Sequence, residues 1–391
     1  MLSALKTLPH ARDWLAPLIA GFVTVLVGYT SSAAVVFEAA RALGADSAQI
    51  ASWLLSLGVG MGVGAVYLSW RFRAPINVAW STPGAALLIA AAGDISLAEA
   101  TGAFLFSAAL IWLSGITGLF ARLLSTIPQS LGAALLAGIL LQFTLHAFEL
   151  LPSAWALLLP MLVSYLLMRR WQPRYAVVAC FAVGVLLAAL NGSIDSAQLT
   201  LDIATPVWVT PAFNLPVLLG VGLPLFLVTM ASQNLPGIAA LHGGGYRVPV
   251  SPLISTTGGL NLLLAPLGAF SLNLSAITAA LCISPDAHPD PQKRYWASIT
   301  AGALYLLLGV FGASIGALFM AFPRELVLGI AGIALLGSVG NGLHQALVNE
   351  HEREPALLTF VVTASGISLW GIGAPFWGIV IGCLALFLQR R

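Results

Sequence analysis

Long runs of apolar residues recur along almost the whole chain, and each is long enough to cross a lipid bilayer. A transmembrane helix needs about 20 mainly apolar residues, so this length has room for about twelve to fourteen of them. Only 8% of the 391 residues are charged and 59% are apolar, which is too few charges to cover a soluble protein. A net charge of +2 also offers no basic surface for nucleic acid. The sequence therefore predicts an all-α polytopic membrane protein embedded in the lipid bilayer.

Charges, prolines and glycines delimit fourteen apolar segments. Seven lie within 15–190, a polar stretch at 191–213 is expected to be an extracytoplasmic connection, and seven lie within 214–390. The basic residues test this count, because Lys and Arg concentrate in cytoplasmic segments. With a cytoplasmic N-terminus, every Lys and Arg except Arg41 and Arg324 falls inside. The sequence thus predicts a multi-pass protein with both termini in the cytoplasm.

The two halves of the chain share a weak internal similarity. Ala74-Pro75 precedes the third segment and Ala265-Pro266 precedes the tenth, while Pro128 and Pro323 open the fifth and the twelfth. Because each half has an odd number of segments, the second half would be inverted relative to the first. Inverted repeats are typical of secondary transporters, whose substrates bind near the middle of the membrane. This pattern indicates a carrier.

The third and tenth segments differ from ordinary spanning helices. Polar or small residues alternate with apolar residues at 77–81 and at 271–275, and a period of two predicts an extended strand. After the first of these, Thr82 can cap a helix and Pro83 suits its first turn. Non-helical backbone in a membrane must face protein or a water-filled cavity. We expect a short strand and a half-helix in each repeat, with the two helix N-termini meeting near mid-membrane.

Two helix N-termini that face each other would favour an anion. Each acts as roughly half a positive charge and presents free backbone N–H groups. The eighth segment adds the amides of Gln233 and Asn234 in an apolar run beside Pro236, which indicates either interhelical packing or a binding site. The candidate substrate-binding residues are Ser31, Ser32, Thr82, Gly84, Gln233, Asn234, Ser271, Asn273 and Ser275.

No Asp, Glu, Lys or Arg lies at the centre of an apolar segment, although proton relays usually use such residues. The titratable candidates at segment ends are Glu38, Asp94, Glu99, Glu149, Asp286, His146 and His344. Alternatively, the carboxyl group of the substrate itself carries the proton. No catalytic motif, metal-ligand set or cofactor loop occurs in a suitable context, so we expect no enzyme activity, no metal and no cofactor.

Six segments in combination carry a family resemblance: 28–34, 80–87, 115–122, 224–234, 277–282 and 284–289. Together they make the chain similar, over 15–390, to the bacterial benzoate:proton symporter family (BenE type). That family resembles nucleobase–ascorbate carriers and sulfate permeases in architecture. The resemblance implies a 7+7 inverted repeat of fourteen segments, divided into a core domain and a gate domain.

The resemblance also implies a function. It suggests a protein of the bacterial cytoplasmic (inner) membrane that imports benzoate, or a similar aromatic carboxylate, with a proton, by movement of the core against the gate. A homodimer is compatible with it. In nucleobase carriers, acidic residues of spans 8 and 10 take part in proton coupling. Here the span-8 position resembles Gln233, and span 10 offers only Ser271, Asn273 and Ser275. This departure suits an anionic substrate and leaves the coupling residue open. A carrier for another small anion or a nucleobase is an alternative, and an anion channel is a more distant one.

Overall fold

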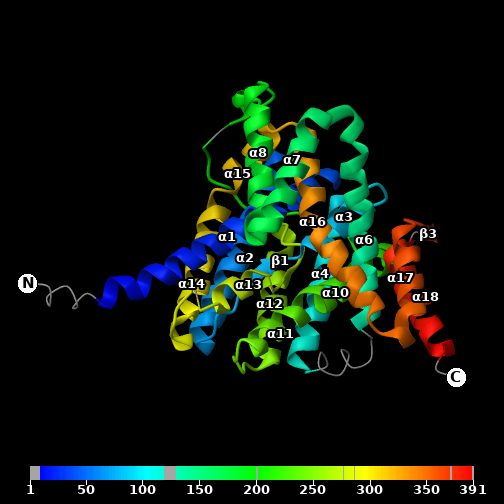
Figure 1. The fold of residues 1–391 in the computed structure, drawn as a ribbon. Coiled ribbons are helices and arrows are strands. Elements are labelled where there is room, and N and C mark those ends of the chain that lie inside the picture. The colour runs from blue at the N-terminus through cyan, green and yellow to red at the C-terminus, as the bar shows by residue number, and fades with distance from the viewer. Residues whose placement is uncertain are drawn as a thin grey trace, which may run out of the picture.

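Helices form most of the described chain, as the apolar runs predict (Figure 1). The computed structural model describes residues 9–118, 129–199, 201–275, 277–285, 287–369 and 372–389, without the side chains at 9–14, 31, 142, 143, 146, 174, 198, 277, 368, 372 and 373. The α-helices of the first half are α1 (Pro9–Ala42), α2 (Ser47–Phe72), α3 (Thr82–Ala91), α4 (Leu97–Ile116), α6 (Gln129–Glu149), α7 (Leu151–Trp171) and α8 (Ala176–Leu190). Those of the second half are α9 (Leu215–Val217), α10 (Leu223–Thr229), α11 (Leu235–Gly243), α12 (Val250–Leu264), α13 (Ile277–Ile283), α14 (Tyr295–Val310), α15 (Gly312–Ala321), α16 (Arg324–Leu347), α17 (Arg353–Ala364) and α18 (Ala374–Gln389).

Several of these helices are long and apolar enough to cross a membrane. Among the described residues 6 qualify, or up to 8 if each bent pair is one span. One such pair is α14 and α15, which are bent by 69° and which the sequence predicts as a single segment. The helical membrane protein is therefore confirmed, whereas the count of fourteen spans stays a prediction.

The eighth expected segment is one continuous helix with two irregular turns. Within Leu215–Gly243, the π-helical turns η4 (Leu218–Gly222) and η5 (Met230–Asn234) flank the regular helix α10. A π turn inserts an extra residue into a helix and is frequent at functional sites. Pro236 therefore does not break this helix, because it follows the widened turn and lies within the first turn of α11.

Two short strands lie at the centre of the molecule, as the alternation predicts. Strand β1 (Val78–Trp80) pairs antiparallel with β2 (Leu272–Leu274), with Ala79 opposite Asn273. Each strand is followed by a helix, α3 or α13. The Ser81 N–H donates to the Ser271 carbonyl, and the Ser275 N–H donates to the Asn77 carbonyl. The pairing is therefore symmetric about Ala79 and Asn273, and the helices leave it at opposite ends.

The helix cap after β1 differs from the expectation. Ser81, not Thr82, is the N-cap of α3, because its Oγ accepts a hydrogen bond from the Gly84 N–H at 3.0 Å. Thr82 is the first helical residue and Pro83 follows it in the first turn, where a missing N–H costs nothing. The hydroxyl of Thr82 is therefore not used as the cap.

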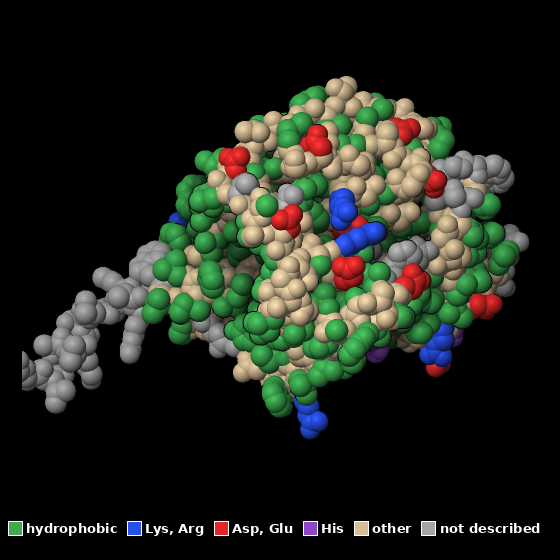
Figure 2. Space-filling model, turned by 90° about the horizontal axis from the view of Figure 1, so that it is seen from above, with side chains coloured by type: hydrophobic (Ala, Val, Ile, Leu, Met, Phe, Trp, Pro, Cys, Tyr) green, Lys and Arg blue, Asp and Glu red, His purple; other side chains and the backbone are tan. Residues whose placement is uncertain are grey.

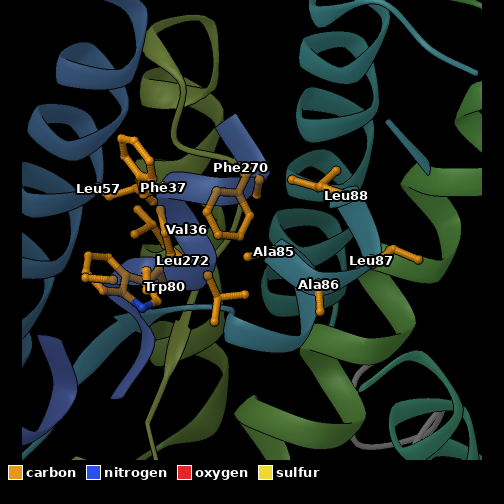
Figure 3. Close-up of a cluster of buried hydrophobic side chains, with 14 of the residues drawn as sticks. Val36, Phe37, Leu57, Trp80, Ala85, Ala86, Leu87, Leu88, Phe270 and Leu272 are labelled. Carbon is orange, nitrogen blue, oxygen red and sulfur yellow. The ribbon is translucent and has the colours of Figure 1, made fainter. Parts of the chain in front are cut away.

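Buried side chains from several helices pack around the strand pair. Figure 3 shows Phe37, Leu57, Trp80, Phe270 and Leu272 gathered there, and all five are buried. Apolar groups that interlock in this way hold strands rigidly. The strand pair is therefore held among packed helices, as non-helical backbone in a membrane requires.

The stretch 191–213 has little regular structure. The short helix η3 (Ser196–Gln198) lies in its described part, and the other described residues there form neither helix nor strand. Backbone hydrogen bonds tie it to helices, from Ala204 to Val310 and from Ala212 to Ala98. The connection therefore follows one end of the helix bundle, and its side of the membrane stays a prediction.

Candidate functional site

A cavity of about 540 Å³ lies beside the strand pair, within the size range of small-molecule sites. One side is formed by residues of α1, α2, α3, η5, α11, α13 and α14 with both strand ends, and the other side by α6 and α16. The cavity extends to Gln129, Asn341 and Gln345, which are exposed near one end of the molecule. A solute can therefore enter from that end, which lies at the bottom of Figure 1 where α6 begins.

Four of the nine candidate residues line this cavity. They are Ser32 of α1, Thr82 of α3, Gln233 of η5 and Ser275, which precedes α13. These residues come from four segments far apart in the sequence. The π turn η5 turns Ser232 and Gln233 toward the cavity.

The N-terminal turns of two helices meet at the cavity. Thr82 and Pro83 of α3 line it from one strand end, and Ser275 and Thr278 line it from the other. The Oγ of Ser275 accepts hydrogen bonds from the Thr278 hydroxyl at 2.6 Å and from the Thr278 N–H at 3.4 Å. Both helix dipoles therefore place partial positive charge at this cavity.

The other candidates lie behind the cavity wall. Ser271, Asn273 and Asn234 are fully buried, and none of them lines the cavity. The Asn234 Oδ1 accepts a hydrogen bond from the Leu274 N–H at 2.8 Å, and Ser271 shares a hydroxyl hydrogen bond of 2.8 Å with Thr229. These two contacts connect η5 and α10 to β2 behind the cavity wall.

Gly84 is also packed rather than exposed to the cavity. A Cβ at this position would lie 2.7 Å from the Leu225 Cδ1 of α10 and 2.9 Å from the Ser81 Oγ, so α3 packs closely against α10 here. The side chain of Ser31 lies outside the described residues, as do Asp286 and the side chain of His146.

Charged groups are missing from the described lining. None of the lining residues that the structure describes is Asp, Glu, Lys, Arg or His. Glu38 lies elsewhere on α1, is buried, and has an Oε2 without a hydrogen-bond partner among the described residues. Glu99 instead caps α4 together with Ser96. Within the described ranges, no group of three or more His, Cys, Asp or Glu side chains could hold a metal ion.

Several lining residues were missed from the sequence. Trp80 and Tyr305 line the cavity, and so does a row on α16 made of Ser338, Asn341 and Gln345. The spacing of three and four residues in that row indicates one helix face. Trp80 stands directly before the cap, but the alternation assigns it to the apolar face of β1.

A second, smaller cavity of about 70 Å³ lies toward the other end of α3. Its lining includes Leu87 and Asp94, Ile139 of α6, and Gly220 and Val221 of η4. One π turn of the eighth segment thus lines each cavity. Between the cavities, α3 packs against α6, where Leu140 faces the large cavity and the neighbouring Ile139 faces the small one.

Comparison with known proteins gives relatives over nearly the whole chain. The chain is 48% identical over 365 residues to the inner membrane protein YdcO of Escherichia coli (strain K12), covering 93% of each chain. It is 40% identical over 392 residues to the benzoate membrane transport protein of Acinetobacter baylyi, covering 100% of this chain and 99% of the relative.

Solved structures share the fold at low sequence identity. SLC26A9 matches with a TM-score of 0.66 at 11% identity, covering 100% of this chain and 67% of that chain. The transmembrane domain of the cyanobacterial bicarbonate transporter BicA matches with a TM-score of 0.57 at 14% identity, covering 97% and 98%.

A family model completes the comparison. The model described as "Benzoate membrane transport protein" (BenE) matches residues 13–388. The family consists of membrane transporters and is not an enzyme class. The chain belongs to the benzoate membrane transport protein family.

Proposed function

We propose that this protein is a secondary active transporter that imports benzoate or a similar aromatic carboxylate together with a proton. The observation that carries this proposal is the cavity at which the first turns of α3 and α13 converge, with no charged side chain in its described lining. Two helix N-termini amount to about one positive charge, which matches a single carboxylate. The benzoate transport protein among its relatives supports the substrate class.

The binding residues in this proposal are those that reach the cavity. The Thr82 hydroxyl and the N-termini would bind the carboxylate, with Ser275 and the amide of Gln233 beside them. An uncharged lining suits an anion, because a fixed carboxylate would repel it by several kcal/mol (about 3 kcal/mol at 5 Å in an effective dielectric of 20).

Alternating access is the second part of the proposal. The large cavity extends to one end of the molecule, and the small cavity lies on the other side of the α3–α6 contact. We take α6 and α16 as parts of a gate domain and α1, α3, α10 and α13 as parts of a core domain. Movement of one against the other would close the large cavity and open the small one.

Orientation and repeat structure belong to the same proposal. The face seen from above in Figure 2 carries scattered acidic side chains and few basic ones, which supports an extracytoplasmic assignment. The large cavity would then face the cytoplasm. The symmetric pairing about Ala79 and Asn273 supports a 7+7 inverted repeat in the bacterial inner membrane, with both termini inside.

Proton coupling has two candidate routes. The proton is carried either on the substrate's carboxyl group or on Glu38. Glu38 is buried on α1, the helix that supplies Ser32 to the cavity, and α1 packs against α16 of the opposite wall. The Oε2 of Glu38 is buried without a hydrogen-bond partner among the described residues, so we assign the proton to Glu38.

Counterflow into proteoliposomes tests the proposal. Vesicles loaded with unlabelled benzoate are diluted into labelled benzoate at mildly alkaline pH, where little neutral acid leaks. We expect transient accumulation that protein-free vesicles lack and that other aromatic carboxylates inhibit. Folded protein without counterflow would exclude benzoate and favour a carrier for another anion or nucleobase. Flux without counterflow or saturation would favour a channel.

A further inference from the structure

Three aromatic side chains form one part of the cavity wall, which we call the aromatic wall: Tyr29, Trp80 and Tyr305. Trp80 and Tyr305 line the cavity, and Tyr29 packs against both. Its ring centroid lies 4.9 Å from that of Trp80 in an edge arrangement, and 6.2 Å from that of Tyr305 in a stacked one. Such geometries are the favourable ones for aromatic pairs, so the three rings hold one another in place.

A chain of hydrogen bonds fixes the indole of Trp80. Its Nε1–H donates to the Ser32 Oγ at 2.8 Å, and the Ser32 hydroxyl donates to the Gly28 carbonyl at 2.8 Å. The one proton of Ser32 is therefore already used. Ser32 touches the cavity but acts mainly as a positioning residue that sets the orientation of Trp80.

The aromatic wall lies next to the N-terminus of α3. Trp80 stands two residues before Thr82, so its ring lies close to the N-terminal turn of α3. Leu136 and Leu140 of α6 and Leu335 of α16 line the facing side of the cavity. Next to the anion-binding end of the proposed function, the cavity thus offers an apolar slot lined by the rings of Trp80 and Tyr305 and by aliphatic groups of α6 and α16.

We infer that the aromatic wall recognises the ring of the substrate and selects a planar aromatic ring that carries its carboxylate directly. This inference rests on the proposed function and adds which residues contact the ring of the substrate. Trp80 and Tyr305 are only 4% and 2% exposed, so they present small, rigid surfaces. A flat ring can meet such surfaces edge to face. A saturated ring is thicker and fits these surfaces less well. A small anion without a ring does not contact them.

Competition in the counterflow assay tests this inference. For the wild type we expect cyclohexanecarboxylate to inhibit labelled benzoate at least tenfold more weakly than unlabelled benzoate, with acetate weaker still. Trp80→Leu and Tyr305→Leu should raise the KM for benzoate about tenfold and remove most of the preference over cyclohexanecarboxylate. Ser32→Ala should shift the same preference in the same direction, and Ser32→Thr should restore it.

Control variants separate this effect from general damage. Trp155→Leu removes an indole that is 64% exposed on α7 and should leave the preference unchanged. If Trp80→Leu does not fold, Leu136→Ala tests the facing side of the slot without touching the Ser32–Trp80 bond. Wild-type counterflow with an unchanged preference in the folded variants would overturn the inference alone. Absence of counterflow in the wild type would overturn the proposed function instead.

Discussion

The side-chain oxygen of Asn234 accepts a hydrogen bond from the backbone N–H of Leu274 at 2.8 Å, which fastens the π turn η5 to strand β2. Its Nδ2 lies 3.1 Å from the Met230 Sδ within the same turn. Gly237 adds a close approach, since a Cβ there would lie 2.8 Å from the Leu274 Cβ. The residue next to Asn234 is Gln233, which lines the cavity. The Asn234–Leu274 hydrogen bond therefore fixes the position of Gln233 relative to the strand pair.

Replacement of Asn234 tests that contact. Asn234→Ala leaves the Leu274 N–H buried and unpaired, at a cost of about 1–3 kcal/mol. We expect a lower melting temperature in detergent and weaker benzoate uptake, because η5 loses its fixed position. Asn191→Ala, at an exposed helix end, is the matched control and should change neither. Equal stability of the Asn234 and Asn191 variants would contradict the supporting role.

Substitutions at Thr82 and Ser81 should have different effects, the first on substrate binding and the second on stability. Thr82→Val keeps the shape and removes the hydroxyl, so we expect the KM for benzoate to rise about fivefold (about 1 kcal/mol for one hydrogen bond) at unchanged stability. Ser81→Ala removes the cap of α3 and should cost about 1 kcal/mol of stability. Uptake kinetics and thermal unfolding measure the two effects. A stability loss in Thr82→Val would mean that Thr82 caps the helix after all.

A carboxylate at position 233 should oppose the substrate. Gln233→Glu is neutral when protonated and repels benzoate once ionised, by on the order of 100-fold in affinity at close range. We therefore expect uptake relative to the wild type to fall as the pH rises, whereas Gln233→Leu should lose saturable uptake at every pH. Both variants should insert normally into the membrane, and size-exclusion chromatography of the purified proteins checks that they are intact. Normal kinetics in Gln233→Leu would remove this residue from the site.

Glu38 should affect coupling rather than binding. Glu38→Gln cannot release a proton, so we expect counterflow to persist while accumulation driven by a pH gradient is lost. The nearby charges of Arg41 and Arg324 are unchanged in this variant. Glu325→Gln, at a partly exposed site in the first turn of α16, is the control. Wild-type accumulation in Glu38→Gln would assign the proton to the carboxyl group of the substrate.

The α3–α6 contact should act as the seal between the two cavities. Leu87 and Ile139 are buried and face the small cavity, so the double change Leu87→Ala, Ile139→Ala thins the seal. We expect passive benzoate efflux from loaded vesicles to rise several-fold and accumulation to fall. The control Leu159→Ala, on an exposed face of α7, should leave passive benzoate efflux at the wild-type rate. No added leak in the folded double variant would place the seal elsewhere.

Much of the fold could be predicted because its signals are local. Apolar runs of span length predict membrane helices without any knowledge of their partners. The alternation at 77–81 and 271–275 predicts strands for the same reason, and both strands are present. The cap was placed one residue too late because Ser81 and Thr82 are both good caps, and only the hydrogen bond to Gly84 distinguishes them.

The candidate site could be predicted only in outline. A list of polar residues cannot separate Gln233, which lines the cavity, from its neighbour Asn234, which binds β2. That choice depends on the π turn, which changes the direction of each side chain and has no clear local signal. Trp80 was missed because its alternation places it on an apolar face, whereas its indole N–H binds Ser32 of α1, a contact between distant segments.

The sequence alone determined that this chain is a helical membrane protein and located the two strands β1 and β2, because hydrophobicity and its period act over a few neighbouring residues. The tertiary structure decided which strands pair, which helix N-termini share a cavity and which polar groups reach it. Ala79 and Asn273 are far apart in the chain, and their pairing follows from the packing of many helices at once. That packing is a property of the whole chain, and no short segment contains it.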